Sequence, residues 1–123
     1  MASSTIMLTN QNELSYTGPA AKADGYYGFS DGIHTASFHV KNFTGRIWLQ
    51  ATLVDNPTED DWFVIQLSVA TPYFEYNNES DCRGATFSGN FVYVRTVVDR
   101  STVTETEYDP SVHGILDKAV LLI

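Results

Sequence analysis

The sequence predicts a single all-β domain, residues 1–123, folded as a two-sheet antiparallel β-sandwich of the jelly-roll type with about eight strands. Aromatic residues make up 13% of the 123 residues. Gly, Pro, Asn or Asp interrupts every long window, so a stretch of helical periodicity is hard to find. A chain of this length suits one domain, which buries roughly two thirds of its unfolded surface in one core.

The clearest strand signal lies in residues 43–67, where two runs of alternating side chains flank an acidic turn. In the first run the apolar side chains that share a face are Ile47, Leu49, Ala51 and Leu53. In the second run they are Phe63, Ile65, Leu67 and Val69. A period of two indicates strands with one face on a core, and the turn formers of residues 55–61 predict a β-hairpin.

The remaining elements follow from the same alternation and from turn residues. Strands are expected at residues 5–9, 13–16, 35–41, 71–76, 91–98 and 118–123, and loops at residues 24–35, 77–84 and 99–112. In the strand at 35–41, Ala36, Phe38 and Val40 face inward and His39 outward. Residues 77–84 are the most polar stretch, which favours a loop.

The core is expected where the longest strands have in-phase apolar positions. These positions are Leu49, Leu53, Trp62, Ile65, Phe91 and Leu121. Arg95 interrupts the apolar strand at 91–98, and a guanidinium there requires a carboxylate or carbonyl partner. Its two interpretations are a structural ion pair and a binding role.

Charge and cysteine usage exclude several classes of function. The net charge is −8, with 7 basic residues spread singly along the chain, which argues against nucleic acid as a partner. No apolar run approaches the roughly 20 residues of a membrane-spanning helix, and residues 1–5 lack the pattern of a secretion signal. The single cysteine, Cys82, cannot form an internal disulfide, as in proteins that fold in a reducing cytoplasm.

Catalytic, metal and cofactor sites are not expected. His34, His39 and His113 lie outside metal-ligand spacing of one another and of Cys82. The sequence neighbours of Cys82 are Arg83 and acids, without a base that would activate the thiol. The acidic residues of the turns lack the spacing of a calcium loop, and no strand-to-helix serine motif is present, so the protein is not expected to be an enzyme.

Aromatic residues in the expected loops and edge strand are the candidates for partner or ligand contact. They are Tyr26, Tyr27, Phe29, Tyr73, Phe74 and Tyr76. Such side chains stack on sugar rings or on a partner's side chains, and they also close the open ends of sandwich domains.

The order of the segments DGYYGFSDGIHT, FTGRIWLQATL, DDWF and FSGNFVYVR resembles virion structural proteins of tailed bacteriophages, particularly T4-like cyanophages, over nearly the whole chain. Such proteins are similar to galactose-binding-like sandwiches, in which a G-x-I-x-L-x-A-x-L strand precedes a turn and an anchoring Trp. Gly45 to Leu53 and Trp62 stand at those positions. No residue matches a sugar-binding triad of those relatives.

The resemblance implies a non-enzymatic virion protein that is assembled in the bacterial cytoplasm. It would decorate the capsid or belong to the tail, neck or baseplate, in repeated copies that contact other virion proteins. The alternative is a carbohydrate-binding module that adheres to host glycans from the particle surface.

Overall fold

The computed structural model describes residues 4–11, 15–23, 25–26, 32–67, 72–99 and 114–122. Within them the chain forms β-strands and one short 3-10 helix, and no α-helix. The elements are β1 (Ser4–Gln11), β2 (Ser15–Thr17), β3 (Ala21–Lys22), β4 (Ile33–Thr52), η1 (Glu59–Asp61), β5 (Phe63–Val64), β6 (Phe74–Ser88), β7 (Tyr93–Asp99) and β8 (Ile115–Leu122). The predicted all-β class is confirmed.

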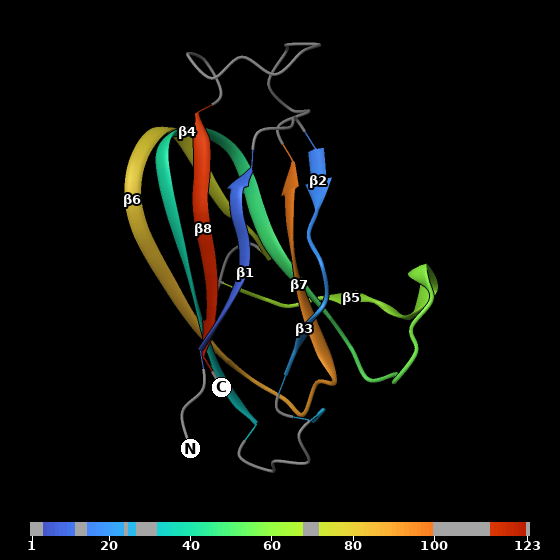
Figure 1. Ribbon diagram of the computed structural model, residues 1–123. Helices are drawn as coiled ribbons and strands as arrows, with labels where there is room; N and C mark the ends of the chain where they lie inside the picture. Colours follow the sequence, from blue (N-terminus) through green and yellow to red (C-terminus); the bar gives the residue numbers. More distant parts are fainter. Residues whose placement is uncertain are drawn as a thin grey trace.

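The described strands pair antiparallel in one eight-stranded sheet. The order along the sheet is β1-β8-β4-β7-β2, while β3 adds to β7, and β5 and β6 pair with β4. Figure 1 shows β4 and β6 as long, strongly bent strands, with β8 and β1 between β6 on the left and β7 and β2 on the right.

β4 connects both sides of the molecule because its two halves have different neighbours. Residues 33–41 pair with β6 and β8, whereas residues 46–52 pair with β7. Between the halves, Asn42 has a φ of 50° and Gly45 a φ of 139°, and the register with β6 shifts. Such left-handed residues and bulges bend a strand sharply. The arch of β4 is visible at the top of Figure 1.

The bend curls the sheet around its own core. The Thr96 hydroxyl of β7 donates to Met7 Sδ of β1 in the interior, at 3.8 Å, although these strands are not neighbours in the sheet. The predicted division into two separate sheets is not confirmed, because β4 and β6 run through the bend and keep the described strands in one hydrogen-bonded sheet.

The prediction of a loop at residues 77–84 is wrong, because β6 extends unbroken from Phe74 to Ser88. Backbone pairing with β4 holds this polar stretch in place, with Cys82 opposite His39 and Asp81 opposite Val40. Its polar side chains remain in contact with water on an outer strand, so the strand needs few apolar residues. Of the predicted loops at 24–35 and 99–112, only residues 25–26, 32–35 and 99 belong to the described part of the chain.

The core fills the inside of the curled sheet. Of the predicted core residues, Leu49, Ile65, Phe91 and Leu121 are buried. Leu53 is 63% exposed, which corrects its assignment to the core. The reason is that β4 ends at Thr52, so the alternation no longer points residue 53 inward.

The predicted hairpin is present but short. Gln50 pairs with Val64 and Ala51 with Phe63, and the Ile65 amide donates to the Leu49 carbonyl at 2.9 Å. Trp62, also predicted for the core, is partly buried on the outside of the sheet, and the Arg95 guanidinium covers its ring. Phe63 and Val64 are exposed because β5 lies at the margin of the sheet and pairs with β4 alone.

Candidate binding surfaces

Of the predicted contact residues in the first aromatic loop, Tyr26 is the one that the structure describes. It is 44% exposed, its ring centroid lies 5.6 Å from that of Tyr93, and Lys22 Nζ lies 4.7 Å from its ring. Tyr27 and Phe29 lie outside the described residues.

The second predicted group consists of Tyr73, Phe74 and Tyr76, whose side chains differ in burial. Tyr73 is partly buried, with the Arg46 guanidinium 4.4 Å from its ring. Phe74 is partly buried and packs edge-on against Phe38, at 5.8 Å between ring centroids. Tyr76 is only 2% exposed and packs edge-on against Phe43, so its assignment to partner contact is wrong. Strand β6 turns Tyr76 toward the core.

Burial changes the acidity of Tyr76. Loss of solvation raises the pKa of this phenol to about 12, and nearby Arg83 opposes the shift. The Arg83 guanidinium lies 4.8 Å from the Tyr76 ring. Within the described part of the chain, the Tyr76 hydroxyl has no hydrogen-bond partner. This side chain therefore stabilises the core through its ring.

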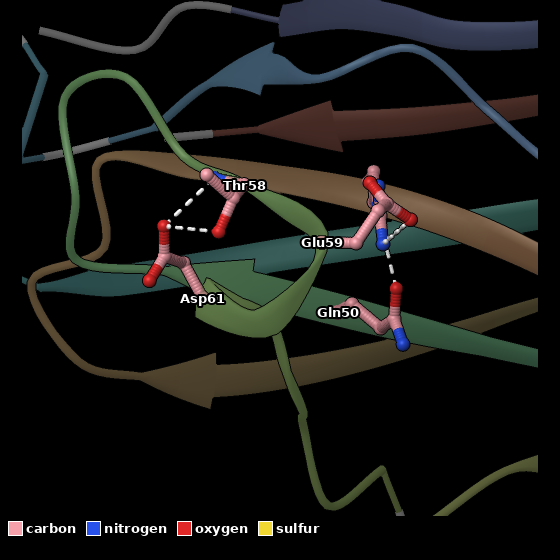
Figure 2. Close-up of polar contacts among 5 residues, drawn as sticks. Gln50, Thr58, Glu59 and Asp61 are labelled. Atoms are coloured by element: carbon pink, nitrogen blue, oxygen red, sulfur yellow. Dashed lines mark hydrogen bonds and ion pairs between the residues drawn. The ribbon is translucent and has the colours of Figure 1, made fainter.

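Arg95 forms a structural ion pair, which is one of the two interpretations that the sequence allowed. Its Nε donates to Gln50 Oε1 at 2.8 Å, and Nη1 and Nη2 donate to the Glu59 carboxylate at 3.2 and 3.4 Å. In Figure 2 the side chains of Gln50 and Glu59 lie near each other, and Asp61 accepts hydrogen bonds from Thr58. These contacts connect the turn between β4 and β5, which contains η1, with strand β7.

Four apolar side chains lie near one another on the outer side of β1, β8 and the beginning of β4. We name this patch the β1–β8 face, and it consists of Ile6, Ile33, Val120 and Leu122. Ile6 is 60% and Ile33 61% exposed, and Leu122 is also exposed. Ile6 lies opposite Val120, and Leu122 lies opposite Thr35, two positions along β4 from Ile33. Opposite and diagonal positions on neighbouring strands are in contact range, so the four side chains form one patch.

A groove lies on the outer side of β2, β7 and the second half of β4. We name it the Trp48 groove; its volume is about 330 Å³. Its lining includes Ser15, Thr17, Trp48, Val97 and Asp99. Thr17 pairs with Val97 and Val97 with Trp48, so the three form a row across the strands. The sequence did not single out Trp48, although its phase opposite the buried Leu49 indicates an outward side chain.

The structure brings together a thiol and a base that are distant in the sequence. His39 Nε2 lies 3.5 Å from Cys82 Sγ and 3.3 Å from Ser37 Oγ. The expectation that Cys82 lacks a neighbouring base is wrong, because His39 is its partner residue in the β4–β6 pairing. Cys82 is exposed.

The other histidines do not join this pair. His34 is buried and stacks on Phe87, at 5.3 Å between ring centroids, on the inner side of β4, away from outward-facing His39. His113 lies outside the described residues. Among the described residues, no three His, Cys, Asp or Glu side chains form a group that could hold a metal ion. In the same part of the chain, no helix is long and apolar enough to cross a bilayer.

In comparisons with known proteins, no family model, curated protein or solved structure matches this chain.

Proposed function

We propose that the protein is a non-enzymatic structural subunit that works through protein contacts in a repeated assembly, and that this assembly is the particle of a tailed bacteriophage. The resemblance of its segments to phage virion proteins supports the second part. The single observation that carries the first part is the exposed β1–β8 face.

The composition of the β1–β8 face fits a contact between proteins. Contiguous apolar patches on a soluble monomer are small, and larger ones mark interaction sites. Charged residues are depleted at the centre of interfaces and return at the rim. On this surface Ile6, Val120 and Leu122 form the centre, and Lys118, opposite Thr9 on β1, lies at the margin.

The free edge of β1 adds a second means of contact. Among the described strands β1 pairs with β8 alone and stands at one end of the sheet order. The outer edge of such a strand presents backbone N–H and C=O groups that can pair with a strand of another chain. Ile6 also lines a pocket of about 270 Å³ between β1 and the segment that contains Tyr16 and Pro19, so a strand of a second copy that enters there would meet apolar side chains and backbone groups together.

The test is a pair of charge substitutions on exposed surfaces. Ile33→Asp combined with Leu122→Asp places two carboxylates in the β1–β8 face. Leu53→Asp is the matched control, because Leu53 is as exposed as Ile33 and lies on the β4–β5 turn. Sedimentation velocity at increasing concentration is expected to show complexes larger than one chain for the wild type and for Leu53→Asp, and single chains for the double variant.

Two results would overturn the proposed contact. One is a wild-type protein that remains a single chain at every concentration. The other is association that survives in the double variant and disappears in Leu53→Asp, which would place the contact on the β4–β5 turn. Circular dichroism of all three proteins checks that each one remains folded.

A further inference from the structure

The Trp48 groove has an apolar floor between two hydrogen-bonded rows. Positions 46, 48 and 50 of β4 pair with positions 99, 97 and 95 of β7. The central pair, Trp48 and Val97, is apolar, and both flanking pairs are polar. The apolar pair therefore lies between two polar pairs in the sheet, and Asp99 of one of them belongs to the groove lining.

The first polar row contains carboxylates held in place by their neighbours. Ser15 Oγ donates to Asp99 Oδ1 at 3.3 Å, and Arg46 Nε donates to Glu75 Oε2 at 2.8 Å. This ion pair raises the pKa of Arg46. The second row is the contact between Arg95 and Gln50, at 2.8 Å. Both rows are built on paired strands and anchored by other side chains, so the groove is largely preformed.

We propose that the Trp48 groove binds an uncharged sugar ring of a glycan. A sugar ring has an apolar face of C–H groups and a rim of hydroxyls. The Trp48 and Val97 side chains match the apolar face, and Asp99, Ser15 and Thr17 match the hydroxyls, which donate and accept hydrogen bonds. Indole is well suited to such a ligand because it buries a large area with little loss of conformational freedom.

Size and charge restrict the ligand further. A volume of about 330 Å³ lies at the lower end of the range for small-molecule sites. The charges beside the groove are paired, Arg46 with Glu75 and Arg95 with Glu59, and Asp99 accepts from Ser15. The net charge of the chain, −8, disfavours phosphates, sulfated sugars and sialic acids, so the ligand class is neutral oligosaccharide.

The groove and the β1–β8 face are built on different strands. The groove lies on β2, β7 and the second half of β4, whereas the face lies on β1, β8 and the first half of β4. The binding proposal does not depend on attachment through the β1–β8 face.

The test starts with an array of neutral and acidic oligosaccharides probed with the wild-type protein. Specific binding to neutral glycans is expected, and the sialylated or sulfated counterparts are expected to bind less. The neutral glycan with the strongest signal is then titrated by tryptophan fluorescence in Trp62→Phe, where Trp48 is the remaining one of 2 tryptophans. A change in Trp48 emission that saturates is expected.

Substitutions then locate the site. Trp48→Ala is expected to weaken binding by about tenfold or more, and Asp99→Asn by a smaller factor. Leu53→Ala, at an exposed position on the β4–β5 turn outside the groove lining, is the control and is expected to bind as the wild type does. Saturation-transfer NMR on the unmodified protein gives the same readout without the Trp62→Phe change.

The proposal is overturned if no neutral glycan binds, if acidic glycans bind more strongly than neutral ones, or if Trp48→Ala binds as the wild type does while folded. A proline-rich peptide that binds the groove with higher affinity than every glycan would also overturn it, and would identify the groove as a site for protein segments.

Discussion

The guanidinium of Arg95 lies 4.1 Å from the ring of Trp62. Arg95 is on β7 and Trp62 follows η1, so this contact joins the turn between β4 and β5 to the outer side of the sheet. The side chain of Arg95 is only 11% exposed, whereas that of its ion-pair partner Glu59 is 83% exposed. The stacking and the bond to Gln50 are therefore the contacts shielded from water, and the ion pair is the solvated one.

Replacing Arg95 by Ala is expected to lower the free energy of unfolding by about 1–3 kcal/mol, because the cation–π contact and the charged hydrogen bond to Gln50 are both lost. The solvated ion pair contributes less, so Glu59→Gln is expected to cost below about 1 kcal/mol. Urea denaturation followed by circular dichroism measures both. Equal losses in the two variants would contradict this division of the contact energy.

Gly114 is expected to be the glycine least tolerant of a side chain in the bend region. Its φ is +69°, and a Cβ at this position would overlap the carbonyl oxygen of Asn42. Asn42 lies at the bend of β4, so relief of the clash would move backbone on both strands. Gly114→Ala is expected to cost more than about 3 kcal/mol, or to prevent folding.

Gly84 on β6 is the matched control for this prediction. A Cβ there would meet the Ala36 carbonyl oxygen at 3.4 Å, an ordinary contact. Gly84→Ala is expected to change the free energy of unfolding by at most about 0.5 kcal/mol in either direction. Thermal denaturation of the two variants side by side compares them, and similar midpoints would contradict the steric explanation.

Tyr76 is expected to make stability fall at alkaline pH. Burial raises its pKa from 10.0 to about 12 in the folded state. Below pH 10 the phenol is neutral in both states and this contribution is fully present. Between pH 10 and 12 the unfolded chain loses the proton first, so stability decreases as the pH rises, by about 2–3 kcal/mol in total.

Tyr76→Phe isolates that contribution, because the hydroxyl has no partner within the described part of the chain. The variant is expected to be as stable as the wild type at neutral pH and to lose less stability than the wild type between pH 10 and 12. Urea denaturation across this pH range measures the difference. Parallel curves for the two proteins would show that Tyr76 is not the group responsible.

The sequence predicts the alternation of β4 well, since a period of two assigns inward and outward faces directly. It places Leu49 inward, and it does the same for Leu53 because no turn residue appears before Asp55 to show that the strand already ends at Thr52. Residues 77–84 of β6 are wrongly predicted as a loop because their polar composition is that of a loop. A strand on the outside of a sheet needs backbone pairing more than apolar side chains, and composition does not show pairing.

Features of the candidate surfaces depend on register between distant strands. His39 and Cys82 are 43 positions apart, and the β4–β6 register brings them opposite each other. The polar rows beside Trp48 likewise require the β4–β7 register, which sets Gln50 opposite Arg95. Local sequence specifies which face a side chain occupies, but it does not specify which residues of another strand become its neighbours.

The central claim is that the protein is a particle subunit that binds its neighbours through the β1–β8 face. The most direct test begins with mass spectrometry of purified phage particles to detect the chain. Cryo-electron microscopy of the same particles then locates it. We predict the curled sheet at repeated positions, with Ile6, Ile33 and Leu122 covered by an adjacent subunit. Absence of the chain from the particles, or its presence with those three side chains facing solvent, would contradict the claim.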